Sequence, residues 1–189
     1  MRRSLALAAI LAGAALPACV SSQSFAPTCS RPVGSLTILM AQSVPSATEL
    51  PCIRSFPPGW GYGGSDVRSG TARFWLDSDR AGFRAVEVDL SSACSTTGAA
   101  AVPASSDETG ARAFEEPLSL PPHLSANRYL LFPGGCVTYR YRFGAGTSTT
   151  LALEAEETLS LVPRSIVVSQ VQAEFGLTLC GAGASPCPG

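Results

Sequence analysis

The sequence predicts a mainly β or α+β fold, in which an antiparallel sheet or meander packs against one C-terminal helix and is held by disulfide bonds. Three observations lead to this fold class. Apolar and polar residues alternate along 71–78, 83–90 and 137–143, which is the pattern of strands with one buried face. Segments rich in Gly and Pro separate these runs. Seven cysteines occur in a chain of 189 residues.

The strands at 71–78 and 83–90 predict their own register. Leu76 lies on the apolar face of the first strand, and Val86 lies on the apolar face of the second. Pairing these faces places Leu76 opposite Val86, because a shift by one residue would turn one apolar set toward solvent. A three-residue loop over 80–82 then joins the strands, and its glycine supplies a positive backbone φ.

Shorter elements are expected on both sides of this pair. The compact apolar run 36–41 indicates a buried strand. The segment 51–64 is rich in Pro and Gly and indicates an irregular loop. Beyond the pair, we expect a loop over 91–107, a short edge strand over 111–116 and a further strand over 128–132.

A second hairpin is expected in the last third of the chain. Val, Tyr and Phe alternate with Thr and Arg along 137–143, and Leu alternates with Glu after the turn-forming segment 144–148. Pairing the two runs places Tyr141 opposite Leu151, so that apolar side chains face inward and charged side chains face outward. Residues 158–161 are expected to extend this meander.

The segment 165–175 is the predicted helix. Pro163 precedes it and Gly176 follows it, and both residues are typical of helix boundaries. On a helix, Val168, Val171 and Phe175 lie on one face. The β-branched residues of the segment favour a strand instead, and that alternative stays open.

The first residues have the features of an export signal. Two arginines after the first Met are followed by thirteen mostly apolar residues, too few to span a bilayer core of about 30 Å. Leu16-Pro17-Ala18-Cys19 resembles a bacterial lipobox. The resemblance implies removal of the signal 1–18 and lipidation of Cys19, which attaches the protein to the extracytoplasmic face of the cell membrane. Residues 19–28 are then a flexible tether, and 29–189 form a single extracytoplasmic domain.

The number of cysteines agrees with lipidation. Seven is an odd number, and lipidation of Cys19 leaves six cysteines for pairing in an oxidising compartment. The sequence alone does not decide their connectivity, and we expect the sequential pairing Cys29–Cys52, Cys94–Cys136 and Cys180–Cys187. Ordinary secretion is the alternative, with Cys19 kept as a free or intermolecular thiol or lost with the signal.

Charge and cysteine spacing exclude several partners. Removal of Arg2 and Arg3 with the signal leaves eleven arginines against fourteen carboxylates, a net charge of −3. The remaining chain has no basic run, so nucleic acid is a poor partner. No two cysteines are separated by only two to four residues, so we expect no metal site and no cofactor.

Known catalytic motifs are missing from the sequence. It has no Gly-x-Ser-x-Gly, no His-Glu-x-x-His and no phosphate-binding loop. His123 is the only histidine, and a solvated loop residue is its simplest interpretation. Asp77 and Asp79 are typical of a turn rather than of a calcium site. Glutamates at 115–116 and 154–157 offer a glycosidase pair, although solvated strand positions, some of them paired with Arg140 and Arg142, are the simpler interpretation.

The segment 56–64 is the best candidate for ligand contact. Its glycines let the backbone turn freely, and Trp60 and Tyr62 offer flat faces to a sugar or a peptide. The alternative is that both rings cover the sheet edge near Cys52. The segment 128–139 is similar to a motif of uncharacterised actinobacterial envelope proteins, and this resemblance implies no activity.

These observations predict a lipid-anchored extracytoplasmic binding or accessory module, with an unknown envelope protein or ligand as its partner. Two alternatives stay open. A carrier would hold an apolar envelope ligand between sheet and helix, in a large apolar cavity. An envelope hydrolase would use His123 or a carboxylate pair, and it is the less favoured class because no catalytic motif is found.

Overall fold

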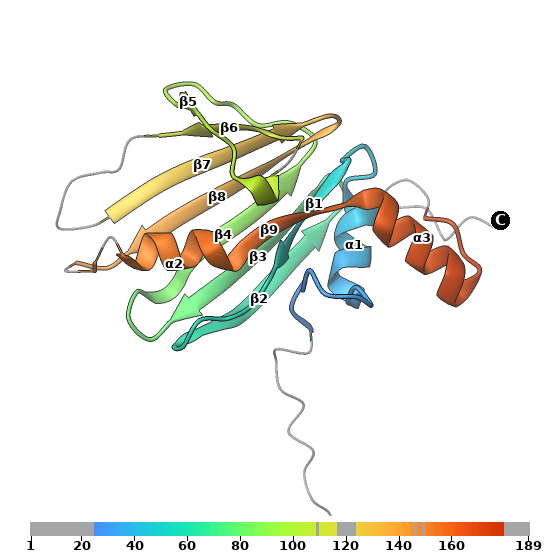
Figure 1. Cartoon of the computed structure of the whole chain (residues 1–189), viewed down its shortest axis with the longest axis horizontal. Helices are drawn as coiled ribbons and strands as arrows, with labels where there is room; N and C mark the ends of the chain where they lie inside the picture. Colours follow the sequence, from blue (N-terminus) through green and yellow to red (C-terminus); the bar gives the residue numbers. More distant parts are fainter. Residues whose placement is uncertain (1–24, 109, 117–123, 146, 149, 180–189) are drawn as a thin grey trace, which may run out of the picture.

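The computed structural model describes residues 25–108, 110–116, 124–145, 147–148 and 150–179 (Figure 1). The helices are α1 (Ser35–Ser43), the short 3-10 helix η2 (Ser106–Glu108), α2 (Thr150–Thr158) and α3 (Arg164–Phe175). The strands are β1 (Glu49–Ile53), β2 (Trp60–Arg68), β3 (Thr71–Ser78), β4 (Gly82–Ser91), β5 (Ala100–Val102), β6 (Arg112–Glu115), β7 (Leu124–Phe132), β8 (Gly135–Phe143) and β9 (Leu159–Pro163). The predicted signal, Cys19 and most of the predicted tether lie outside the described residues.

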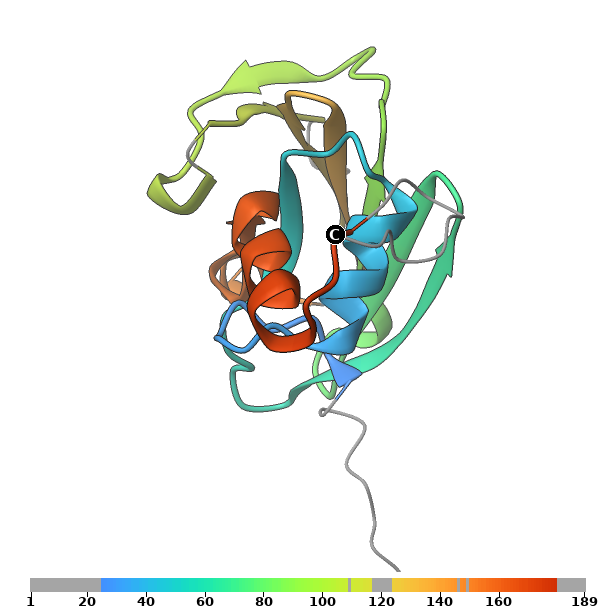
Figure 2. The ribbon, with the colours of Figure 1, turned by 90° about the vertical axis from the view of Figure 1, so that its right-hand side faces the viewer.

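Seven strands form one antiparallel sheet in the order β2-β3-β4-β8-β7-β6-β5. The sheet curves, and α1, α3 and the two-stranded sheet β1-β9 lie on its concave side (Figure 2). Helix α2 lies on the same side, over β8 (Figure 1). The predicted fold class is confirmed, because the structure is mainly antiparallel sheet with a helix near the C-terminus and disulfide bonds.

The core lies on the concave side of the sheet. Phe74 and Leu76 of β3, Val86 and Val88 of β4 and Met40 of α1 are fully buried in one cluster. Burying an apolar side chain of this size contributes about 1.5–3 kcal/mol to folding. The central strands and α1 therefore provide a rigid frame for the rest of the sheet.

The predicted register of β3 and β4 is confirmed, with Leu76 opposite Val86. The connecting loop is 79–81, one residue earlier than predicted, because the register shifts between Leu76 and Ser78. Gly82 pairs with Ser78 and has a φ of 100°, which glycine adopts without steric cost.

Residues 36–41 belong to helix α1, so the predicted strand is wrong. An apolar run of six residues has no periodicity that separates a buried strand from a buried helix. In the structure the helix extends to Ser43 and buries Leu36, Met40 and Ala41. Leu36 and Met40 are four residues apart and share a helix face.

Residues 150–158 form helix α2, so the predicted hairpin of 137–143 with this segment is wrong. Strand β8 pairs instead with β4 and β7. Leu151, Ala155 and Thr158 are the buried positions of α2, at helical spacing. Ala, Leu and Glu dominate the segment and are strong helix formers, and this preference overrides the alternation of Leu with Glu.

Three further expectations about connecting segments are corrected. Residues 159–163 form β9, which pairs with β1 and does not extend the meander. The predicted loop 51–64 contains parts of β1 and β2. Position 63 in β2 needs a glycine, because a Cβ at Gly63 would lie 2.5 Å from Asp77 Oδ2. The predicted loop 91–107 contains strand β5, which is too short for alternation to reveal. Because β5 pairs with β6, the strand predicted at the sheet edge over 111–116 is an inner strand.

The predicted C-terminal helix is confirmed as α3. Gly176 ends it in the left-handed conformation, with a φ of 64°. Its buried residues are Val167 and Val171, one turn apart. Phe175, which was expected on the buried face, is 59% exposed because the contacts of the helix end one turn earlier.

Two of the predicted disulfides are confirmed. Cys29 bonds Cys52, which joins the N-terminal segment to β1. Cys94 bonds Cys136, which joins the segment after β4 to the start of β8. On the chain-entropy model each bond contributes roughly 3–4 kcal/mol. The third predicted pair falls within 180–189, outside the described residues.

Candidate functional site

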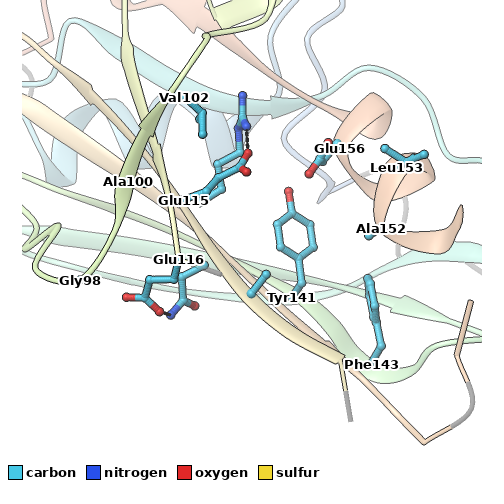
Figure 3. Close-up of a pocket in the computed structure, with 13 residues that line it drawn as sticks. Gly98, Ala100, Val102, Glu115, Glu116, Tyr141, Phe143, Ala152, Leu153 and Glu156 are labelled. Carbon is cyan, nitrogen blue, oxygen red and sulfur yellow. Dashed lines mark hydrogen bonds and ion pairs between the residues drawn. The ribbon is translucent and has the colours of Figure 1, made fainter. Parts of the chain in front are cut away.

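A cavity of about 630 Å³ lies between the sheet and helix α2 (Figure 3). Strands β5, β6, β7 and β8 and helix α2 contribute side chains to it, so it joins segments that are distant in the sequence. Its volume is in the range of about 300–1,000 Å³ that is usual for small-molecule sites. The apolar part of the lining consists of Ala100, Val102, Ala126, Phe143, Ala152 and Leu153.

Small side chains leave this space open. Ala126 on β7 and Ala152 on α2 both line the cavity. Leu153 lines it as well, but this side chain is 60% exposed and extends the apolar surface to solvent. A larger residue at 126 or 152 would occupy volume that is now available to a ligand.

Tyr141 points from β8 into the cavity (Figure 3). Val137, Tyr139, Tyr141 and Phe143 all face inward, as their alternation predicted, and all are buried. Among the described residues, the buried hydroxyls of Tyr139 and Tyr141 have no hydrogen-bond partner. Burial raises the pKa of Tyr141, so its hydroxyl stays protonated and is both a donor and an acceptor.

A smaller cavity of about 200 Å³ shares Arg128, Tyr141 and Glu156 with the larger one. Tyr139 and Glu108 line the smaller cavity. The three shared residues therefore lie where the two spaces meet, and we refer to them as the polar end of the cavity.

Arg128 is held by two glutamates. Its Nε and Nη2 donate to the two carboxylate oxygens of Glu108 at 3.0 and 2.6 Å, and its Nη1 donates to Glu115. The side chains of Arg128 and Glu108 are only 11% and 8% exposed. Burial alone would raise the pKa of Glu108, but hydrogen bonds from Arg128 and Ser105 outweigh burial and lower it. The two carboxylates neutralise the guanidinium, which leaves it little charge to offer a ligand.

Glu156 supplies the carboxylate of the polar end. Its side chain extends from α2 toward Tyr141 (Figure 3). Within the described part of the chain it makes no hydrogen bond or ion pair. Desolvation raises the pKa of Glu156, as do Glu115 and Glu108, while Arg128 acts in the opposite direction. Among the described residues, the Glu156 carboxylate and the Tyr141 hydroxyl are thus polar groups of the cavity lining that have no hydrogen-bond partner.

Glu116 lines the same cavity but already has partners. It accepts hydrogen bonds from the hydroxyl of Tyr129 and from Nδ2 of Asn127 at 2.6 Å. Of the glutamates considered from the sequence as a carboxylate pair, the structure therefore brings Glu115, Glu116 and Glu156 to one cavity. Only the last of these has no hydrogen-bond donor on it among the described residues.

Glu154 lies outside this cavity and pairs with Arg80. The expected pairing of this segment with Arg140 is wrong, because the segment is a helix and not the neighbouring strand. Arg140 instead contacts Glu87 at 2.8 Å and Asp89 at 3.2 Å across the β4-β8 pair.

Trp60 and Tyr62 do not line the cavity, because both lie on β2 at the opposite edge of the sheet. Trp60 is 5% exposed and packs in the core. Its Nε1 donates to Oε2 of Glu154 at 3.2 Å. Tyr62 is half-buried. The indole of Trp60 is therefore directed into the protein rather than toward solvent.

Asp77 and His123 are two further residues that the sequence analysis considered. Asp77 accepts a hydrogen bond from the backbone N–H of Arg84 at 2.7 Å, which is the turn interaction expected of it. His123 lies outside the described residues.

Sequence reasoning did not identify the polar end. Tyr139 and Tyr141 were placed on an apolar inward face, and two phenols on such a face are a signal, because a buried hydroxyl needs a partner. Arg128 lies opposite Tyr139 in the β7-β8 pair and so faces inward as well. Glu156 carried no such signal, because its position depends on the direction in which α2 crosses the sheet.

Comparison of the chain with known protein families, curated proteins and solved structures finds no match. No helix of the described residues is long and apolar enough to cross a membrane. The same residues contain no group of three or more His, Cys, Asp or Glu side chains that could hold a metal ion. The fold and the cavity together form a largely apolar pocket with one polar end on an antiparallel β-sheet.

Proposed function

We propose that the protein is a lipid-anchored, extracytoplasmic binding protein that takes up an amphipathic small molecule in the cavity beneath α2. The observation that carries the proposal is the buried hydroxyl of Tyr141. It has no partner among the described residues and faces a largely apolar space. Burying an unpaired hydroxyl costs about 1–3 kcal/mol, and a ligand that bonds to it would remove that cost.

The apolar walls of the cavity support the carrier that the sequence left as an alternative. Moving apolar ligand surface out of water contributes roughly 25 cal/mol per Å², and the alanines on β7 and α2 leave room for it. The polar end then fixes the orientation of the ligand, since a few polar groups in an apolar pocket determine specificity.

The two disulfides support an oxidising compartment, and the signal-like first residues with the resemblance of 16–19 to a lipobox support attachment to the membrane. Intact-mass measurement of the protein from the membrane fraction tests this part. We expect loss of residues 1–18 and an added lipid mass on Cys19. A mature protein without lipid, or with several thiols reactive under native conditions, would contradict the compartment.

Binding in the cavity is tested with a photoactivatable alkyl alcohol, added to membranes that hold the full-length protein. We expect peptide mass spectrometry to locate the cross-links on β7, β8 and α2. Ala152→Trp fills the cavity and should abolish this labelling. Ala173→Trp is the matched control, because it places the same side chain on an exposed position of α3.

Two further measurements keep this test decisive. Thermal unfolding of both Trp variants shows whether each is folded. Tyr141→Phe removes only the hydroxyl and should weaken labelling while the cavity stays open. Cross-links confined to other surfaces, or unchanged labelling of a folded Ala152→Trp variant, would refute the proposed function.

A further inference from the structure

We infer that the polar group of the bound molecule is a positively charged amine, which donates hydrogen bonds to the carboxylate of Glu156 and the hydroxyl oxygen of Tyr141. The inference rests on the proposed function and specifies the chemical class of the ligand. The body of the ligand is apolar and lies against Phe143 and the alanines of β7 and α2.

The charges around the cavity exclude an anionic ligand. Its lining contains three carboxylates and one guanidinium. That guanidinium, on Arg128, already contacts Glu108 and Glu115. A carboxylate or phosphate in the larger cavity would thus meet Glu156 while the guanidinium of that lining is already bonded, and like charges at short range are unfavourable.

The hydrogen-bonding groups at the polar end also fit an amine. Tyr141 is 3% exposed, its hydroxyl has no partner among the described residues, and it points into the cavity toward Glu156 (Figure 3). An ammonium group has three donors and no acceptor, which matches a carboxylate and a hydroxyl oxygen that both accept. A charge-assisted hydrogen bond of this kind is about twice as strong as a neutral one.

Glu116 and Glu115 do not provide an equivalent site. Glu116 is bonded by Tyr129 and Asn127, and Glu115 is bonded by Arg128. A ligand at either glutamate would compete with a donor that the protein already supplies. Glu156 is therefore the acidic residue of the cavity at which a new cation gains a full interaction.

The test uses three photoactivatable probes that share one alkyl diazirine chain and end in an amine, an alcohol or a carboxylate. Membranes that hold the full-length protein are labelled over a range of probe concentrations. We expect half-maximal labelling of the cavity by the amine at a concentration roughly tenfold below that of the alcohol, the effect of one charge-assisted bond. The carboxylate should label the cavity most weakly.

Glu156→Gln is expected to reduce the roughly tenfold preference for the amine over the alcohol to near one. The alcohol should label this variant as well as it labels the wild type. Glu154→Gln is the matched control, because it removes a glutamate from the same helix that pairs with Arg80 outside the cavity. It should keep the preference for the amine, and it corrects for any general attraction of amines to the membrane.

The two proposals fail in different ways. Equal labelling by amine and alcohol, stronger labelling by the carboxylate, or an unchanged preference in Glu156→Gln would overturn the inference about the amine and leave the binding cavity standing. Failure of all three probes to label the cavity would overturn both.

Discussion

Replacing Tyr141 with Phe is expected to stabilise the unliganded protein. In the wild type the Tyr141 hydroxyl is buried and has no hydrogen-bond partner among the described residues. A buried group of this kind costs about 1–3 kcal/mol of folding free energy. We use the lower end of this range as a conservative value. The substitution should therefore raise the free energy of unfolding by about 1 kcal/mol.

Urea unfolding of the purified mature protein, followed by circular dichroism with the disulfides intact, measures this change. With a slope of about 1–3 kcal/mol per molar urea, a gain of about 1 kcal/mol raises the midpoint by roughly 0.3–1 M. In a thermal experiment the same gain raises Tm by about 2–4 °C for a protein of this size.

Tyr129→Phe is the matched control for this prediction. The Tyr129 hydroxyl donates to the carboxylate of Glu116, so its removal should lower the free energy of unfolding by about 1.5–3 kcal/mol. The two Tyr→Phe variants are thus expected to shift the midpoint in opposite directions. A decrease for Tyr141→Phe comparable with the decrease for Tyr129→Phe would show that the Tyr141 hydroxyl has a partner, and the reasoning for the site would fail.

Three further predictions concern stability. Glu108→Ala leaves a buried guanidinium with one carboxylate fewer and should cost about 3 kcal/mol, and an unchanged urea midpoint would contradict the buried pair. Gly134→Ala should lower Tm more than Gly70→Ala: both glycines have a positive φ, but a Cβ at Gly134 would overlap the backbone oxygen of Ser46, whereas a Cβ at Gly70 meets nothing within 4 Å. Equal losses would argue against that close approach. Because the folded-state pKa of Glu156 is raised above 4.5, this carboxyl favours folding at low pH, and the contribution is lost as the pH rises through the folded pKa. Glu156→Gln should therefore gain more stability over the wild type at pH 7 than at pH 4, and equal gains at both values would contradict the shift.

The elements that the sequence predicted correctly are those with two independent local signals. The register of β3 and β4 followed from apolar alternation together with the turn that ends in Gly82. Helix α3 followed from Pro163 before it and Gly176 after it. The two confirmed disulfides joined cysteines that are neighbours in the order of the chain.

The elements that the sequence predicted wrongly are those with one ambiguous signal. The apolar run of α1 fits a buried strand as well as a buried helix. In α2, Leu151, Leu153, Glu154 and Glu156 match both a strand with two faces and a helix. Long-range packing decided both cases, since α1 packs against β1, β2 and β3, and α2 packs against β9, rather than pairing with a neighbouring strand.

The sequence by itself determined which side chains of each central strand face the core and where the last helix begins and ends, because these depend on neighbours along the chain. It did not decide how the cysteines pair, because Cys29–Cys52 and Cys94–Cys136 join residues that are 23 and 42 positions apart. The candidate site was decided only by the tertiary structure. Its polar end takes Arg128 from β7, Tyr141 from β8 and Glu156 from α2. Whether these three side chains meet depends on the path of α2 across the sheet, and contacts between distant segments, rather than local periodicity, set that path.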